Sequence, residues 1–220
     1  MLKSSDYIDD KTLWDNLRAG NKNAFNDLFR KFYSELFYYG VKITPNADLV
    51  EECIQEVFIR IWETRLNLSD VKNIKSYLLI SLRRLVLLKK EKEKKYSKLD
   101  IDSAEKYSFL FEENEFEKHK EIQEEVRTVL LDAINLLTKK QRELIMLFFF
   151  HELSYPDIAQ VMDISVPSVR NLMYRTLVRL RDVIGTDSIS AMQNILFFFF
   201  SSKALKSRNN LIMPFWFFSL

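Results

Sequence analysis

The scarcity of glycine and proline limits what this chain can fold into. Its 220 residues include three glycines and four prolines. Tight hairpin turns and glycine-rich phosphate loops depend on these two residue types, so a many-stranded sheet has little material for its turns. The sequence therefore predicts an all-α protein built from long helices. This length allows one large domain or two small ones, because domains of about 100 residues bury enough surface to fold alone.

Hydrophobic residues recur at helical spacing through the first half of the chain. The pattern predicts helices over 11–43, divided at Gly20, then over 48–65 after Pro45, and over about 74–95. The helix over 48–65 places Cys53 and its apolar neighbours on one face. The opposite face carries Glu51, Glu52, Gln55, Glu56 and Glu63. We interpret residues 8–95 as a helical domain.

The second half predicts a helix-turn-helix. Periodicity fails over 96–121, which we interpret as a flexible linker, and returns over 122–185. Thr138 and Gln141 form a capping-box pattern that opens a helix over 139–150. A short helix follows Ser154, and a longer one begins after Ser165 and runs to about 184. A helix, a three-residue turn and a longer basic helix make up a helix-turn-helix, so we predict a second helical domain here.

The last helix has a face suited to DNA. Val166, Val169, Met173, Leu177 and Leu180 share the predicted inner face. The outer face holds Pro167, Ser168, Arg170, Asn171, Tyr174, Arg175 and Arg179. A helix fits the major groove, where Arg can bond guanine, Asn can bond adenine and further Arg side chains can neutralise phosphates. An ordinary solvated face is the alternative, and the preceding short helix and turn favour DNA.

A basic run ends the helix predicted over 74–95. From Arg83 to Lys98 there are eight Lys or Arg against two Glu, although the formal net charge of the chain is only +2. Such a run can hold the phosphates of a nucleic acid. The residues that we expect at this site are Tyr77, Arg83, Arg84, Lys89, Lys90 and Lys92. Tyr77 is either an aromatic wedge between bases or a core residue.

Two stretches resemble the extracytoplasmic-function group of the sigma-70 family of RNA polymerase sigma factors. Residues 133–184 resemble region 4 of that group, most specifically in the Leu-Ser-Tyr-x-x-Ile-Ala pattern over 153–159. Leu17-Arg18-Ala19-Gly20, Ala24-Phe25 and the stretch 51–62 resemble region 2. The two matches occur in the family's order with a charged linker between them.

The resemblance implies a division of labour between the domains. Region 2 of the family binds the clamp helices of core RNA polymerase and recognises the minus-10 element, whereas region 4 binds the flap and the minus-35 element. The polymerase-facing role here falls on Glu51, Glu52, Gln55 and Glu56. The resemblance places the minus-10 role on Tyr77 and the basic set given above, and the minus-35 role on the outer face of the last helix. An exposed Glu/Gln face agrees, since it can meet a basic helix of a partner. The resemblance also implies an anti-sigma factor as a further partner.

The chain departs from the family pattern at two places. Arg84, Leu88 and Glu91 stand where many members carry Asn and then Asp-x-x-Arg. The turn before the last helix has Asp163 where the family usually shows Gly, and Asp tolerates the left-handed backbone that this turn requires. We therefore expect the turn to be kept.

The sequence gives no reason to expect an active site. One cysteine and two histidines form no metal cluster, and His151-Glu152 lacks the second His of a zinc-protease motif. We expect no enzyme activity, no cofactor, no metal and no small-molecule substrate. Neither a signal peptide nor an apolar stretch of about 18 residues is present, which predicts a cytoplasmic protein.

Two rival functions remain at this point. The first is a stand-alone helix-turn-helix regulator that binds an operator as a dimer. The second is a membrane-surface or interaction adaptor built around the aromatic tail over 186–220, whose role the family resemblance does not explain.

Overall fold

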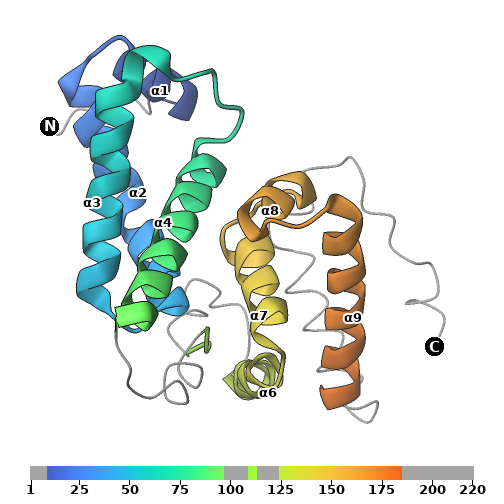
Figure 1. The fold of residues 1–220 in the computed structure, drawn as a ribbon. Helices are drawn as coiled ribbons and strands as arrows, with labels where there is room; N and C mark the ends of the chain where they lie inside the picture. Colours follow the sequence, from blue (N-terminus) through green and yellow to red (C-terminus); the bar gives the residue numbers. More distant parts are fainter. Residues whose placement is uncertain (1–8, 97–108, 113–123, 185–220) are drawn as a thin grey trace, which may run out of the picture. The chain divides into compact units, whose positions relative to one another are not determined.

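The structure is a computed structural model that describes residues 9–96, 109–112 and 124–184. The regular structure within these ranges is helical, which confirms the all-α prediction (Figure 1). The described residues form two compact units. The first lies within Met1–Leu110 and Pro156–Val166, and the second within Phe111–Tyr155 and Pro167–Leu220. The short segment Pro156–Val166 groups with the first unit, so these units do not coincide with the predicted domains. The predicted domain and linker boundaries remain predictions.

The first unit is a helical bundle. It contains α1 (Asp10–Arg18), α2 (Lys22–Ile43), α3 (Ala47–Thr64), a 3₁₀ turn η1 (Arg65–Asn67) and α4 (Ile74–Tyr96). Helix α2 packs against α1, α3 and α4, and α3 also packs against α4. The predicted break is present, since Gly20 has φ of 87°, a left-handed conformation that favours glycine. The side chains of Asn21 and Asn46 accept hydrogen bonds from the first backbone N–H groups of α2 and α3.

The core of this bundle follows the predicted apolar faces. Leu17, Leu28, Ile54 and Leu82 are at most 1 % exposed. Cys53 is fully buried, as predicted for a core thiol, and burial raises its pKa to about 11. This thiol is therefore protonated and unreactive at neutral pH.

Gly40 lets α2 and α3 cross closely. A Cβ atom added at Gly40 would overlap Cγ1 of Val50 and lie 3.2 Å from its Cγ2. Since Val50 is fully buried, it has no free space to move into. The α2–α3 crossing therefore depends on the absence of a side chain at this position.

The second unit is built on α6 (Glu124–Asn135), α7 (Lys139–Ile145) and α9 (Val166–Ile184). The predicted capping box is present: the Thr138 N–H donates to Gln141 Oε1 (3.0 Å) and the Gln141 N–H to Thr138 Oγ1 (3.4 Å). Helix α7 continues as a π-helical turn over Met146–Phe150, so the single helix predicted to 150 changes its hydrogen-bond spacing near its end.

The helix-turn-helix connection has the predicted local structure. Helix α8 (Tyr155–Met162) ends just before Asp163, whose φ of 56° is left-handed, and α9 starts at Val166. Asp163 thus supplies the left-handed backbone conformation that this turn requires, as expected for a short polar side chain.

Two phenylalanines within the predicted linker are buried. Phe109 is fully buried and Phe111 is 3 % exposed. In the second unit the Phe111 N–H donates to Asn135 Oδ1 (2.8 Å), and Asn135 Nδ2 donates to the Phe111 carbonyl (3.0 Å). The sequence analysis found no core face over 96–121, because isolated aromatics without helical spacing give no periodic signal.

Candidate functional site

The exposed face of α9 carries every residue that was predicted to contact DNA from this helix. Val169, Met173 and Leu180 are buried on the opposite side. Leu177 is only half-buried, and Thr176 takes an inner position instead, because its hydroxyl can bond a backbone carbonyl one turn back (2.7 Å). The exposed residues are Pro167, Ser168, Arg170, Asn171, Tyr174, Arg175 and Arg179.

Local contacts orient two of these side chains. Arg175 Nε donates to Asn171 Oδ1 (3.2 Å), one helical turn away. Burial raises the pKa of Tyr155, and the positive charge of Arg170 opposes this rise. These side chains therefore form one polar, positively charged surface along α9.

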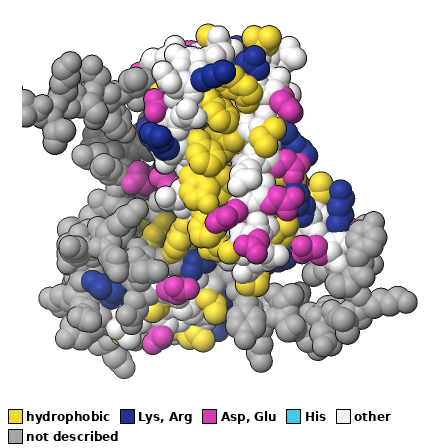
Figure 2. Space-filling view, turned by 90° about the vertical axis from the view of Figure 1, so that its left-hand side faces the viewer, with side chains coloured by type: hydrophobic (Ala, Val, Ile, Leu, Met, Phe, Trp, Pro, Cys, Tyr) yellow, Lys and Arg dark blue, Asp and Glu magenta, His cyan; other side chains and the backbone are white. Residues whose placement is uncertain are grey.

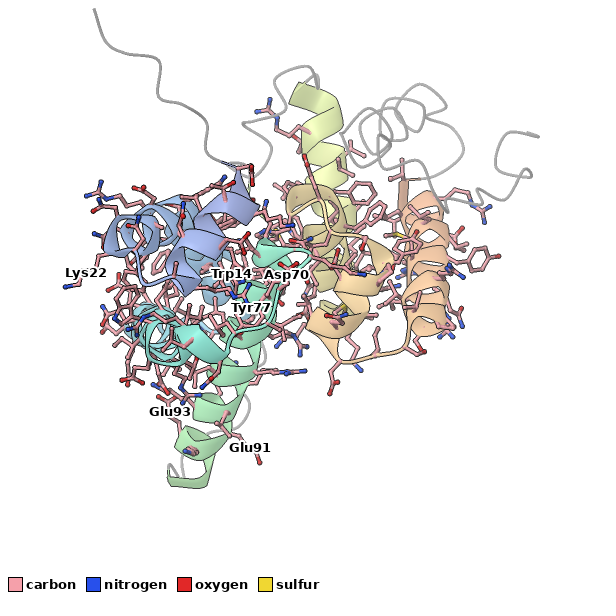
Figure 3. The ribbon with its side chains drawn as sticks, turned by 90° about the horizontal axis from the view of Figure 1, so that it is seen from above. Trp14, Lys22, Asp70, Tyr77, Glu91 and Glu93 are labelled. Carbon is pink, nitrogen blue, oxygen red and sulfur yellow. The ribbon has the colours of Figure 1, made fainter. Side chains whose placement is uncertain are left out.

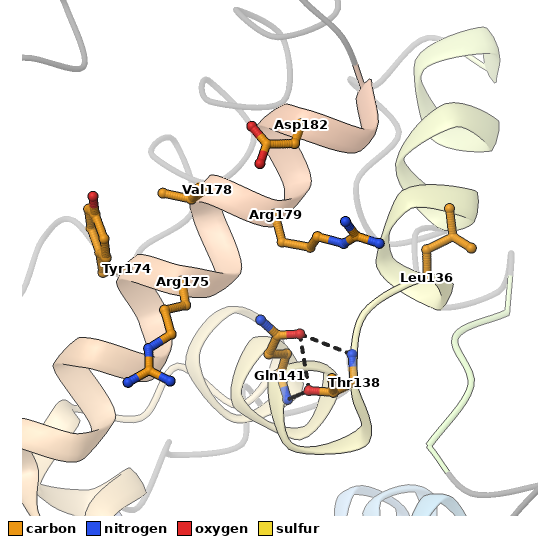
Figure 4. A pocket seen from close by; sticks show the side chains of 8 residues that line it. All are labelled: Leu136, Thr138, Gln141, Tyr174, Arg175, Val178, Arg179 and Asp182. Carbon is orange, nitrogen blue, oxygen red and sulfur yellow. Dashed lines mark hydrogen bonds between the residues drawn. The ribbon is translucent and has the colours of Figure 1, made fainter.

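The C-terminal half of this face borders a groove (Figure 4). The groove has a volume of about 500 Å³ and separates α9 from the start of α7. Leu136, which is 62 % exposed, contributes to an apolar part of its lining. Its lining comprises Leu136, Thr138, Gln141, Tyr174, Arg175, Val178, Arg179 and Asp182. The predicted DNA face thus divides into an open N-terminal part and a part that lines a groove.

A second groove lies between α3 and α4 in the first unit. Its volume is about 310 Å³. Val57, Ile61 and Leu85 form buried lining, while Arg60 and Arg84 are exposed. The remaining lining residues are Thr64, Tyr77, Ser81 and Leu88. An apolar lining beside two guanidinium groups suits a planar base attached to a phosphate backbone.

The structure brings only some of the predicted minus-10 residues to this groove. Tyr77, which is half-buried, and Arg84 line it, and Lys92 is exposed further along α4. Arg83 is half-buried and does not line it. Lys90 Nζ donates to the Ile43 carbonyl (2.8 Å), where a cation meets the C-terminal end of α2.

Lys89 was predicted to contact DNA, but it pairs with two residues that were predicted to contact polymerase. Its ammonium lies 2.8 Å from Glu52 Oε1 and 2.8 Å from Glu56 Oε2. Burial opposes the charge of Lys89, but the hydrogen bonds to these two carboxylates raise its pKa to about 12. The hydrogen bond from Lys89 lowers the pKa of Glu56 in turn, and Glu56 also pairs with Arg60. These charges therefore stabilise the α3–α4 contact.

The acidic face of α3 lies beside an aromatic stripe. Glu51, Glu52 and Gln55 are exposed and Glu56 is half-buried. Figure 2 shows hydrophobic side chains running along this face with acidic side chains next to them. The stripe, which we name the aromatic stripe, consists of half-buried Phe25, Phe29, Tyr33, Phe37 and Trp62.

Ring contacts hold the aromatic stripe together. Phe25 lies edge-on to Trp62 (5.3 Å between centroids), and Tyr33 stacks on Phe37 (6.1 Å). Burial and the neighbouring Glu51 carboxylate, which forms a hydrogen bond with the phenol, raise the pKa of Tyr33. The sequence analysis did not identify this stripe as a surface, although its four-residue spacing along α2 is visible in the sequence.

Trp14 supports the α3–α4 connection from α1. Its indole is 1 % exposed, and Nε1 donates to the Ser69 carbonyl (3.3 Å). Its ring lies edge-on to Tyr77 with centroids 5.4 Å apart, and Figure 3 shows both near Asp70. Trp14 therefore fixes both the loop before α4 and one lining residue of the α3–α4 groove.

Within residues 9–96, 109–112 and 124–184, no three His, Cys, Asp or Glu side chains gather in a way that could hold a metal ion. The helices of these same ranges include none that is long and apolar enough to cross a membrane.

Family models match both halves of the chain. Residues 28–95 match the model described as Sigma-70 region 2, and residues 127–180 match Sigma-70, region 4. Together the two segments cover more than half of the chain, in the order that the sequence analysis predicted. The chain belongs to the sigma-70 family.

Several relatives of this sigma factor carry the name of the extracytoplasmic-function group, ECF. It is 25 % identical over 187 residues to the ECF RNA polymerase sigma-E factor of Escherichia coli K12, with 78 % of this chain and 92 % of that protein covered. It is 22 % identical over 175 residues to the RNA polymerase sigma-E factor of Streptomyces antibioticus, with 80 % and 92 % covered. This confirms the predicted ECF group.

A solved structure shares the fold. The sigma factor is similar to CnrH, solved in complex with the cytosolic domain of CnrY, with a TM-score of 0.52 at 17 % identity. The similarity covers 81 % of this chain and 99 % of CnrH. Sigma factors are regulatory proteins that direct transcription initiation by RNA polymerase. The rival of a stand-alone regulator is not favoured, because it leaves the region 2 match over 28–95 unexplained.

Proposed function

We propose that this sigma factor contacts the minus-35 element through the N-terminal, open part of the α9 face. The observation that carries this proposal is that all seven predicted residues are exposed while the opposite face of α9 is buried. The first turns of a recognition helix approach the base edges in helix-turn-helix complexes. Arg170 and Asn171 are therefore proposed as base contacts, and Ser168 and Arg175 as phosphate contacts.

The α3–α4 groove is proposed as the minus-10 site. Arg84 would hold a phosphate, Tyr77 would offer a ring edge to an unstacked base, and Lys92 would add charge further along α4. Lys89 and Lys90 are assigned a smaller part in DNA binding than the sequence suggested, since both bond to protein groups.

Core RNA polymerase is proposed to bind the α3 face together with the aromatic stripe. Gln55 and Glu51 supply polar contacts at its edge, and Tyr33 and Phe37 supply apolar area. Interfaces of stable complexes combine aromatic anchors with a polar rim, which this arrangement offers. The apolar side of the groove beside α9 is proposed as a second polymerase contact, because exposed Leu136 and half-buried Val178 suit a protein side chain better than a phosphate.

Run-off transcription tests the proposal. Core polymerase would be combined with promoter fragments and either the wild type, Arg170→Ala/Arg175→Ala, or the control Lys22→Ala/Arg30→Ala, which removes the same charge from exposed positions of α2. The α9 variant should lose promoter occupancy, since the lost base contact of Arg170 costs about 1–3 kcal/mol. It should still co-purify with polymerase, because the α3 face, the aromatic stripe and the apolar side of the groove are unchanged. Equal occupancy by the α9 and control variants would reject the minus-35 assignment.

Three further assignments are part of the proposal. The sigma factor has no catalytic activity of its own and acts in the cytoplasm, where polymerase meets the genome. A protein partner of the kind that CnrY is for CnrH, an anti-sigma factor, is proposed by analogy with that complex. The aromatic tail over 186–220 lies outside the described residues, so the structure does not test its role.

A further inference from the structure

A short piece of the linker packs into the first unit. Phe109 is fully buried, with its ring edge-on to that of Tyr39 (6.0 Å between centroids, 75° between planes), and Tyr39 is itself fully buried. The φ of Phe109 is 71°, a left-handed conformation that phenylalanine rarely adopts. Such a backbone persists only where surrounding contacts enforce it, and the burial of the ring supplies that contact.

A buried lysine holds the next residue. Lys42, on the last turn of α2, is 7 % exposed, and its Nζ donates to the Leu110 carbonyl (2.7 Å). The same ammonium lies 5.2 Å from the centroid of the Tyr38 ring. A lysine is rarely buried unless its charge is bonded, so this geometry describes a built site for a peptide carbonyl.

We propose that the C-terminal end of α2 is a docking site for the chain's own linker. Phe109 is the anchor that fills the site beside Tyr39, and Lys42 recognises the carbonyl that follows it. The site recognises a peptide segment in which an aromatic residue with a left-handed backbone precedes a solvent-exposed residue. Leu110 takes the second position, with its side chain 41 % exposed. The inference does not depend on the proposed DNA and polymerase contacts.

Docking changes the length of the tether between the helices that the linker joins. With Phe109 in its site, the tether toward α6 starts at Leu110 and not at Tyr96. A shorter tether raises the effective concentration of one tethered binding module at the site of the other. The docking site therefore sets the length of chain that joins the first unit to α6.

Lysine reactivity measures the docking directly. Full-length protein would be acetylated briefly with a water-soluble amine reagent, and the labelling of Lys42 would be compared by mass spectrometry with that of exposed Lys22, which projects from the first unit in Figure 3. Phe109→Ala should raise the Lys42 rate relative to Lys22 by about tenfold or more, because the site opens. The matched control Leu110→Ala keeps the carbonyl and should leave the ratio unchanged.

Two outcomes would overturn the proposal. One is an unchanged Lys42 ratio in Phe109→Ala, and the other is an equal rise in Phe109→Ala and Leu110→Ala. Circular dichroism and a cooperative melt would show that each variant is folded. Hydrogen exchange on Lys42→Met tests the second half of the site: amide exchange of Phe109 and Leu110 should accelerate severalfold, and unchanged exchange there would remove Lys42 from the proposal.

Discussion

Replacing Lys89 with methionine tests whether the charges between α3 and α4 stabilise the fold. Methionine keeps the length and most of the apolar stem of the side chain but removes both ion pairs. The Lys89 side chain is 19 % exposed, whereas Glu52 is 66 % and Glu56 is 30 % exposed. Exposed pairs contribute about 0.2–1 kcal/mol each, so the pair with Glu56 should lie near the upper end and that with Glu52 near the lower end. We expect a loss of about 1 kcal/mol, or about 4–8 °C in Tm for a domain of this size.

The pH dependence gives the sign of the effect. The pKa of Glu56 is lowered in the folded state, so its contribution is present above the ordinary glutamate pKa of about 4.3 and is lost as the pH falls through the lowered value. The pKa of Lys89 is about 12, so its charge is constant throughout this range. The difference in Tm between wild type and Lys89→Met should therefore be full at pH 7 and shrink in acid.

Thermal melts at pH 7 and in acid, read by circular dichroism, provide the assay. Lys92→Met is the matched control, because Lys92 is an exposed lysine one turn further along α4. A double-mutant cycle with Glu56→Gln isolates the pair, and we expect a coupling of about 0.5 kcal/mol or more. The reasoning fails if Lys89→Met and Lys92→Met have the same Tm at pH 7. It also fails if the Tm difference between wild type and Lys89→Met is as large in acid as at pH 7.

Three other substitutions test local contacts by thermal or urea unfolding. Thr138→Ala should cost about 1 kcal/mol because it removes the cap of α7, and no change would show that the cap is dispensable. Asn135→Ala should lower the free energy of unfolding by about 1–3 kcal/mol, since both backbone groups of Phe111 lose their partner. An unchanged free energy of unfolding would show that water replaces the amide. Trp14→Phe should cost about 0.5–1.5 kcal/mol for the bond to Ser69, and a cost equal to that of Trp14→Ala would refute a separate role for the indole N–H.

Helix positions were predictable because burial repeats with the helical period. The break at Gly20, the capping box at Thr138 and the left-handed turn at Asp163 were also predictable, since each depends on residues close in sequence. The exposed face of α9 follows from the same periodicity. These features carry most of the fold and the minus-35 assignment.

Contacts between distant residues were not predictable from the same patterns. Lys89 was assigned to DNA and Glu52 to polymerase, because nothing local shows that their helices place these charges 2.8 Å apart. The aromatic stripe was read as part of the bundle, since periodicity cannot distinguish a fully covered face from one that is half covered. Phe109 was missed because its partner Tyr39 lies far away in sequence.

The tight crossing at Gly40 and Val50 has an evolutionary consequence. No side chain fits at position 40 while a β-branched residue occupies position 50, so mutation at either site changes which residues the other can accept. Alanine at 40 becomes accessible only after position 50 has shrunk, and the order of the two steps matters because the reverse order passes through an overpacked intermediate. Homologous lineages should therefore show paired substitutions at these two positions, with the smaller residue at 50 appearing first.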